Sequence, residues 1–243
     1  LIPKWIARDR CTKRQLLSLI GKLAFATKVV RGGRTFLRRL IDLSMSTRVL
    51  EEKIVLSAEA KRDMLWWNTY LPKWNGKSLI LDASTTLHSA LHLFTDASDK
   101  GFGIAYSRRW LCGSWPSYIL RNLTKFDINF RELFSVYVAA ITFGHEWPGL
   151  RIIIHTDNLP IVHAWFKGTS PSPTIMTLIR NIIMTSSLNN YTLLFQHIPG
   201  VKNDLADALS RLDIARFKQL APESDPQPTS ISKNIWNWHK SPF

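Results

Sequence analysis

The first 72 residues carry apolar positions at helical spacing in three successive runs. The first run opens with a capping-box pattern, Thr12 followed by Gln15, and stops at the glycine pair 32–33. Its helically spaced residues are Leu16, Leu17, Ile20, Leu23, Ala24 and Thr27. The second run is basic, and its inward-facing positions are Phe36, Leu37, Leu40 and Ile41. The third spans residues 57–70 and ends before Pro72, so the pattern predicts a mainly helical segment.

From about His88 the pattern changes to that of strands alternating with helices. Three runs are close enough to form an antiparallel meander: residues 91–98, 101–110 and 111–116. The elements predicted after it are a helix at 129–147, a buried strand at 151–158, helices at 159–166 and 172–187, a strand at 191–197 and a closing helix at 201–220. This order predicts an α/β domain. The proline-containing stretch from Pro222 onward is predicted to be a linker.

Charge points to a polyanionic partner. The 243 residues include 32 Lys and Arg against 18 Asp and Glu, which gives a net charge of +14. Residues 1–85 hold 17 of these basic residues and 7 of the acids, and no acid occurs from Arg10 through Ile41. A solvated surface is the alternative, but solvated helices usually mix signs, so we expect nucleic acid to bind here. The candidate contacts are Lys13, Arg14, Lys28, Arg31, Arg34 and Arg38.

Other compositional features restrict the setting of the protein. Cys11 and Cys112 are far apart and form no C-x-x-C pattern, which indicates neither a disulfide framework nor a zinc site and favours a reducing, intracellular compartment, cytoplasm or nucleus. No apolar run approaches the roughly 18 residues of a membrane span, so no membrane partner is expected. Because the sequence begins at Leu1 rather than Met, we expect a piece of a longer polyprotein.

Three acids are candidates for a site near the carboxyl ends of predicted strands, the position where α/β domains bind ligands. Asp96 and Asp157 each end a predicted strand, and Glu132 lies on the same helical stripe as Val136 and Ala139. Each aspartate taken alone could be a strand-end cap or a turn residue. Together with a fourth aspartate on the last helix, for which Asp204 and Asp207 are equal candidates, they suggest a phosphodiesterase that uses two Mg²⁺ ions, with Mn²⁺ as a possible substitute.

The motifs T-D-A-S, N-F-R-E-L, H-T-D-N, H-I-P-G and N-D-L-A-D-A-L-S-R make residues 88–212 resemble type 1 ribonuclease H of retroelements. The resemblance implies a ribonuclease H-like mixed five-stranded sheet with flanking helices. It implies that the four metal-binding acids are Asp96, Glu132, Asp157 and Asp207, which leaves Asp204 as a solvated or helix-start residue. It also implies that His197 assists product release, although a structural histidine is the alternative. Asn129 matches an amide that contacts RNA 2′-hydroxyls in relatives, with a helix N-cap as the alternative.

The preceding region resembles the thumb and connection of a reverse transcriptase from tyrosine-recombinase (DIRS-type) retroelements. This resemblance rests on residues 12–44 and on W-W-N-T-Y-L-P-K-W-N-G. The expected domains are a basic helical segment at 1–85, a ribonuclease H domain at 86–215 and a Pro-rich tail at 216–243. The palm aspartates of a polymerase are missing, since no Asp-Asp dipeptide occurs, so we expect no DNA synthesis.

The expected activity is endonucleolytic hydrolysis of the RNA strand of RNA/DNA hybrids by two-metal catalysis, with the polymerase portion of the same polyprotein as a partner. The residues 167–173 are too short to be the basic substrate-gripping handle of cellular relatives, so the grip would fall to the N-terminal segment. Two alternatives stay open. One is a catalytically inactive nucleic-acid-binding module derived from a retroelement, and the other is an integrase-like or resolvase-like nuclease that cuts DNA.

Overall fold

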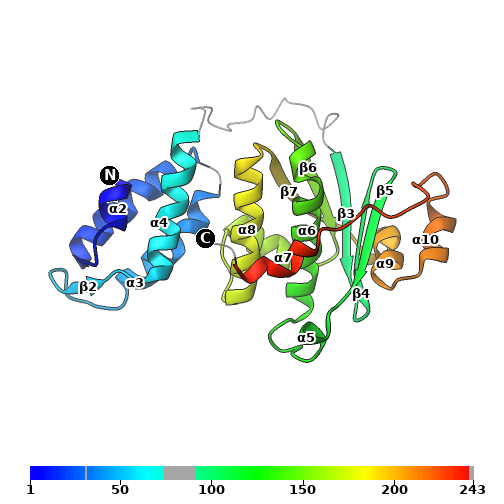
Figure 1. Cartoon of the computed structure of the whole chain (residues 1–243). Helices are drawn as coiled ribbons and strands as arrows, with labels where there is room; N and C mark the ends of the chain where they lie inside the picture. The colour runs from blue at the N-terminus through cyan, green and yellow to red at the C-terminus, as the bar shows by residue number, and fades with distance from the viewer. Residues whose placement is uncertain (31, 74–90, 241–243) are drawn as a thin grey trace. The chain divides into compact units, whose positions relative to one another are not determined.

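The computed structural model describes residues 1–30, 32–73 and 91–240. The chain divides into two compact units, Leu1–Thr85 and Thr86–Lys240, which are coloured from blue to cyan and from green to red in Figure 1. Among the described helices, none is both long and apolar enough to cross a membrane.

The first unit is mainly helical, as the pattern predicts. Its helices are α1 (Ile2–Ile6), α2 (Lys13–Ala26), α3 (Arg38–Ser44) and α4 (Ala58–Tyr70), with 3-10 turns η1 (Gly33–Leu37) and η2 (Leu71–Lys73). Two short strands, β1 (Arg10–Thr12) and β2 (Lys53–Val55), pair antiparallel. The predicted capping box is confirmed, because the Thr12 hydroxyl accepts from the Gln15 amide and the Gln15 side chain accepts from the Thr12 amide.

The buried stripe of α2 differs from the predicted one. The helix buries Leu16, Leu19 and Leu23, whereas Leu17 is exposed. Leucines crowd this helix on two adjacent stripes, so the pattern alone cannot say which stripe faces the core. The core is aromatic: the Phe36 ring stacks on Trp66 with centroids 4.2 Å apart.

The second unit has a mixed five-stranded sheet in the order β5-β4-β3-β6-β7. Its strands are β3 (Leu91–Ala97), β4 (Gly101–Tyr106), β5 (Arg109–Ser114), β6 (Arg151–Thr156) and β7 (Thr192–His197). The first three form the predicted antiparallel meander, and β6 and β7 add parallel to β3. The hairpin turns at Ser107, whose φ is 55°, rather than after Trp110. This topology confirms the expected ribonuclease H-like fold.

Helices cover both faces of the sheet (Figure 1). On one side lie α6 (Ile128–Phe143), α7 (Leu159–Lys167) and α8 (Pro173–Leu188), and on the other lie α9 (Asp204–Ser210) and α10 (Ile214–Leu220). The remaining elements are the short helix α5 (Ser117–Leu120) and the 3-10 turns η4 (Gly144–Glu146), η5 (Gly200–Lys202) and η6 (Lys233–Lys240). Helix α9 lies so close to β4 that a Cβ on Gly103 would come within 2.4 Å of the Ala206 carbonyl oxygen.

The prediction of one closing helix at 201–220 is wrong. The chain forms η5, α9 and α10 instead, with a break at Leu212, whose φ is 60°. Asp213 follows the break and caps α10, since its side chain accepts from the Arg216 amide. A helical stripe of apolar residues can continue across such a break, because the second helix packs its own apolar face on the same core.

The expectation of a Pro-rich linker at 216–243 is also wrong for its described part, residues 216–240. The amides of Asp225 and Thr229 donate to the carbonyls of Arg108 and Trp110, at the free edge of β5. Further along, the Trp236 ring stacks on Phe134 of α6 with centroids 5.2 Å apart. Tryptophan packing holds this segment on the domain despite its prolines. The segment runs from the α10 side of the sheet to the α6 side.

Candidate metal centre

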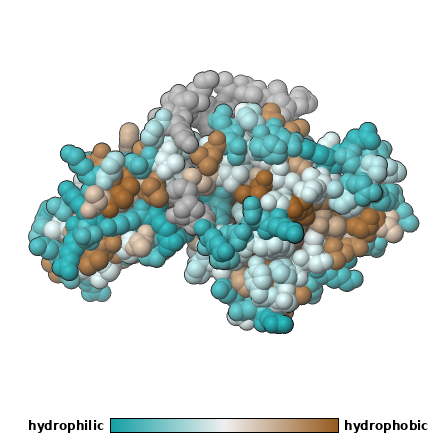
Figure 2. All heavy atoms as spheres, in the orientation of Figure 1, coloured by the Kyte–Doolittle hydropathy of each residue, from teal (hydrophilic) through white to brown (hydrophobic). Residues whose placement is uncertain are grey.

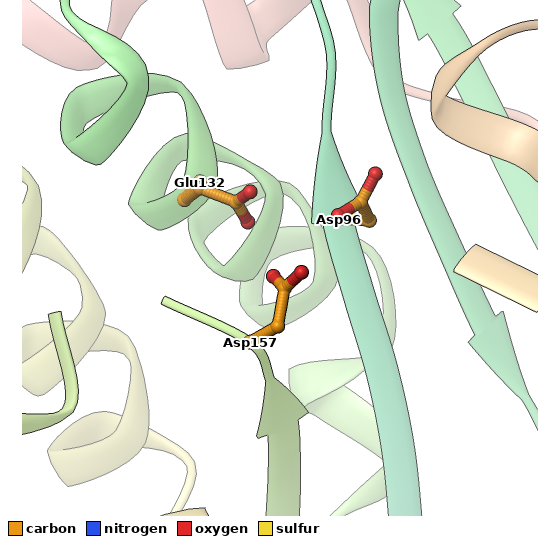
Figure 3. Close-up of side chains that lie close together, drawn as sticks. All are labelled: Asp96, Glu132 and Asp157. Atoms are coloured by element: carbon orange, nitrogen blue, oxygen red, sulfur yellow. The ribbon is translucent and has the colours of Figure 1, made fainter. Parts of the chain in front are cut away.

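Three acids predicted from the sequence meet at one end of the sheet. Asp96 stands near the end of β3, Asp157 directly follows β6, and Glu132 lies on α6. Each offers a carboxylate oxygen, and these oxygens lie within 4.8 Å of one another (Figure 3). Because β3 and β6 are parallel neighbours, their carboxyl ends meet at one edge, as predicted.

Local structure holds α6 and β3 in this arrangement. The side chain of Asp127 accepts from the Phe130 amide and caps the helix one turn before Glu132. The Ser135 hydroxyl, one turn after Glu132, donates to the Asp96 carbonyl oxygen at 3.2 Å. Glu132 therefore reaches the strand end from a helix that is fixed on both sides of it.

Burial and mutual repulsion shift the titration of the centre. Burial raises the pKa of Asp96 to about 6, and the nearby charges of Asp157 and Asp207 act in the same direction, whereas a hydrogen bond from Ser210 lowers it. Burial, followed by the charges of Asp96 and Asp157, raises the pKa of Glu132 well above its usual range. Without a cation, the site therefore favours protonated carboxyl groups.

The donor set fits a hard divalent cation. All three groups are carboxylates, the ligands that Mg²⁺ and Mn²⁺ prefer. Glu132 Oε2 is buried and accepts no hydrogen bond. Among the residues that the structure describes, no lysine or arginine forms an ion pair with Asp96, Glu132 or Asp157. A bound cation would supply the missing partner for these buried charges.

Asp207, the fourth acid implied by the resemblance, does not join the three-residue cluster. It lies on α9, close enough for its charge to raise the pKa of Asp96, but its oxygens contact arginines. Arg211 Nε lies 2.6 Å from Asp207 Oδ1, and Arg216 Nη1 lies 3.3 Å from Asp207 Oδ2. Asp204 is the first residue of α9, in agreement with the expected helix start.

His197 and Asn129 both lie beside the acids. The His197 ring Nε2 is 3.1 Å from the Asp157 carbonyl oxygen, and the histidine is exposed. Asn129 Oδ1 accepts a hydrogen bond at 3.0 Å from the side chain of Asn158, the residue that follows Asp157. The alternative that Asn129 caps α6 is wrong, because Asp127 is the cap.

Two polar residues at the centre were not predicted from the sequence. Ser210 Oγ donates to Asp96 Oδ2 at 2.5 Å, and Asn158 donates to Asn129. In the sequence, Ser210 and Asn158 are marked by their positions in the motifs A-D-A-L-S-R and H-T-D-N. Motif membership does not say which neighbour a side chain will contact, since those contacts join distant parts of the chain.

The predicted basic contacts of the first unit fall into two groups. Three already have partners: Lys13 donates to the Thr47 carbonyl, and Arg14 and Arg38 pair with Glu51 and Asp42. Lys28 and Arg34 are exposed and form no ion pair among the described residues, and Arg31 lies outside them. Hydrophilic side chains cover much of the visible surface in Figure 2, with apolar groups between them.

The fold and the acidic cluster define an α/β domain of ribonuclease H-like fold with a candidate divalent-metal centre. No protein-family model matches the chain. The chain is 29% identical over 126 residues to "Retrovirus-related Pol polyprotein from transposon 297" of Drosophila melanogaster. That match covers 50% of this chain and 11% of the polyprotein, so the chain corresponds to a small part of it. The chain is thus similar to part of a transposon Pol polyprotein.

Two solved structures are also similar to the chain. One is titled "Structure of the foamy viral protease-reverse transcriptase dRH in complex with ds DNA"; it is 14% identical, with a TM-score of 0.29, and the match covers 77% of this chain and 35% of that one. The other is a prototype foamy virus protease-reverse transcriptase CSH mutant, 13% identical, with a TM-score of 0.28 and coverage of 76% and 24%.

Proposed function

We propose that the chain is the ribonuclease H region of a retroelement reverse transcriptase of the DIRS type, with part of the thumb and connection at residues 1–85. Its activity is hydrolysis of the RNA strand of RNA/DNA hybrids with two Mg²⁺ ions, for which Mn²⁺ can substitute. The observation that carries the proposal is the meeting of Asp96, Glu132 and Asp157 at the end of the sheet, with no Lys or Arg partner among the residues that the structure describes.

The chain's own residues have distinct tasks in this proposal. Asp96, Glu132 and Asp157 hold the ions, and Asp207 joins them when its arginine partners release it. The chemistry that divalent ions supply at such a site is activation of a water nucleophile and stabilisation of the leaving oxygen. Ser210 orients Asp96 by its hydrogen bond, and exposed His197 stands at the open side, where it assists product release.

Substrate selection follows from groups around the acids. Asn129 is positioned by Asn158 next to the centre and is proposed to contact 2′-hydroxyls of the RNA strand, which distinguish RNA from DNA. Lys28 and Arg34 of the first unit are proposed to supply further contacts to phosphates of the hybrid. The polymerase portion of the same polyprotein would deliver the hybrid as its product.

A cleavage assay tests the proposal. The full chain is incubated with an RNA/DNA hybrid, single-stranded RNA or duplex DNA, in magnesium, in manganese or with a chelator. We expect cleavage of the hybrid's RNA strand alone and only with a metal. Asp96→Asn, Glu132→Gln and Asp157→Asn should each lower the rate by about 100-fold or more, since each removes a ligand of the ions.

Matched controls separate this result from a contaminating nuclease. Asp225→Asn and Glu223→Gln change exposed or half-exposed acids away from the cluster and should leave cleavage within about twofold. If the wild-type chain binds the hybrid but cuts it in neither metal, the inactive-module alternative holds. Cleavage of duplex DNA instead would favour an integrase-like or resolvase-like nuclease.

A further inference from the structure

Two exposed arginines hold the one expected ligand that is missing from the cluster. Arg211 contacts Asp207 Oδ1 and Arg216 contacts Asp207 Oδ2, so each carboxylate oxygen of Asp207 has its own guanidinium. The arginine side chains are 59% and 48% exposed, whereas the Asp207 side chain is 26% exposed. Both guanidinium groups therefore lie at the solvent side of Asp207, within reach of a bound molecule.

These arginines stand at the border of the metal centre. Ser210, which precedes Arg211, contacts both acids: its hydroxyl donates to Asp96 Oδ2 at 2.5 Å, and the same oxygen lies 3.0 Å from the Asp207 carbonyl oxygen. The positive charge of Arg211 also lowers the pKa of Asp96, against the effect of burial. Arg211 is thus near enough to the centre to influence its charge without contacting the clustered carboxylates.

The backbone beneath the pairs has little room to shift. A Cβ on Gly103 would lie 2.4 Å from the Ala206 carbonyl oxygen and 2.5 Å from Leu209 Cβ, so α9 is seated directly on β4. The side chains of Asp207, Arg211 and Arg216 can change rotamer at much lower cost than the helix can move. An exchange of partners at Asp207 is therefore the motion available at this edge of the site.

The chemistry of the groups favours such an exchange. A divalent ion and a guanidinium need the same carboxylate oxygens of Asp207, so binding of one displaces the other. A displaced guanidinium remains charged and matches a phosphate with two parallel hydrogen bonds. The displaced guanidinium would lie beside the acidic cluster and could bind a phosphate of a nucleic-acid strand that approaches the cluster.

We propose that Arg211 and Arg216 are phosphate-binding residues for the strand that is cut, held by Asp207 in the metal-free protein and transferred to the substrate when Asp207 turns to a bound ion. This inference rests on the proposed function, because it needs a metal at the acidic centre. It assigns substrate contact to two residues of the second unit, in addition to the basic positions of the first.

The first experiment measures metal binding without substrate, by calorimetric titration of the full chain with Mn²⁺. The double variant Arg211→Gln/Arg216→Gln should bind Mn²⁺ about two- to fivefold more tightly than wild type, the range of an exposed ion pair that no longer competes. In a protein that already carries Asp207→Asn, the same double substitution should increase the affinity for Mn²⁺ clearly less, compared with Asp207→Asn alone. An equal gain with and without Asp207 would reflect general charge removal and would overturn the exchange.

The second experiment measures hybrid binding by fluorescence anisotropy, with calcium or with a chelator, after a gel has shown that the RNA strand stays intact. Loss of both arginines should weaken binding about five- to tenfold with calcium and distinctly less with the chelator. Arg108→Gln is the matched control, since Arg108 lies in the β4–β5 turn at the opposite end of the strands and should change both affinities equally.

The outcomes separate this inference from the proposed function. If wild type binds no divalent ion by calorimetry, the metal centre itself fails. If wild type binds the ion, but the arginine substitutions weaken hybrid binding equally with calcium and with the chelator, the metal centre stands and the exchange is wrong.

Discussion

The two units bury acids in opposite electrostatic settings. In the first unit the Asp63 side chain is fully buried, and Arg39 contacts it through Nη1 at 2.9 Å and through its backbone amide at 3.3 Å. In the second unit Asp96 and Glu132 are 7% and 4% exposed, and the charges closest to them include other acids. Burial of an acid is therefore not by itself a functional signal. The sign of the charges that face it distinguishes a structural pair from a metal centre.

Ion pairs reduce the number of basic side chains in the first unit that are available to contact phosphate. Arg14, Arg38 and Arg62 pair with Glu51, Asp42 and Glu59. These pairs are exposed and contribute little to stability, but each neutralises a cation that could otherwise contact phosphate. The number of basic residues in the segment consequently overstates how many of its side chains can contact nucleic acid.

Isosteric substitution of the buried acids should give the largest difference between the units. Asp63→Asn removes the negative charge that faces Arg39, and we expect a loss of about 3 kcal/mol in the free energy of unfolding of the first unit. Asp96→Asn should stabilise the metal-free second unit by about 1 to 3 kcal/mol, because each pKa unit corresponds to about 1.4 kcal/mol and the neutral amide escapes the penalty of burial.

Hydrogen exchange followed by mass spectrometry measures this contrast, since it reports on each unit within the full chain. Asp42→Asn, at an exposed pair, is the control for Asp63→Asn and should change stability by less than about 1 kcal/mol. Equal losses at Asp63 and Asp96 in the absence of metal would contradict the distinction between the two settings.

Apolar packing should hold the C-terminal segment on the second unit. Trp238 packs against Phe130 on α6, and its carbonyl oxygen accepts from Asn181 on α8. We expect Trp238→Ala to cost about 3 kcal/mol in urea denaturation, as for other buried aromatic residues. Phe166→Ala, at a side chain that is 66% exposed, should stay within about 0.5 kcal/mol. A small effect at Trp238 would restore the linker interpretation of the C-terminal segment.

The C-terminal segment also shows where prediction from sequence fails. Prolines predict a linker, and Trp236 and Trp238 occur in a polar stretch without helical or strand periodicity. Their packing partners on α6 are about 100 residues away in sequence, so no local pattern reports them. The pair β1 and β2 escapes prediction for a similar reason, since each strand has only three residues.

The acidic cluster, in contrast, could be predicted because regular geometry positions it. Alternation along β3 sets the face of Asp96, helical spacing sets that of Glu132, and parallel pairing brings Asp157 to the same edge. The state of Asp207 could not be predicted, because the choice between Asp204 and Asp207 needed the resemblance. Its pairing with Arg216 also depends on the break between α9 and α10.

Metal should stabilise the second unit in a pH-dependent manner. The folded-state pKa of Asp96, about 6, exceeds the ordinary value of 3.8, so the folded state holds this proton more tightly than the unfolded state. Without metal, stability should therefore fall as pH rises from about 4 to about 6, and the raised pKa of Glu132 extends the loss to higher pH. Mg²⁺ binds the deprotonated carboxylates and should offset this loss.

Thermal unfolding at pH 5 and pH 8, with and without Mg²⁺, checks this expectation. At a concentration 100-fold above its Kd, the ion should add about 2.7 kcal/mol at pH 8 and much less at pH 5. Asp157→Asn should abolish most of the gain, whereas Asp225→Asn should preserve it. A gain of the same size at both pH values would mean that the ion binds elsewhere.

The smallest expected effect is a difference in the salt dependence of hybrid binding among the basic residues of the first unit. It tests whether paired and unpaired basic residues differ in their contacts to phosphate. Lys28 and Arg34 have no ion-pair partner among the described residues, whereas Arg14 and Arg38 are paired. Each lost phosphate contact should lower the slope of log K against log salt by about 0.9. Lys28→Gln and Arg34→Gln should each approach this value, and Arg14→Gln and Arg38→Gln should fall short of it, because their carboxylate partners already neutralise them. Fluorescence anisotropy of the hybrid at several salt concentrations measures the slopes, and equal slopes for all four variants would mean that hybrid binding breaks the surface pairs.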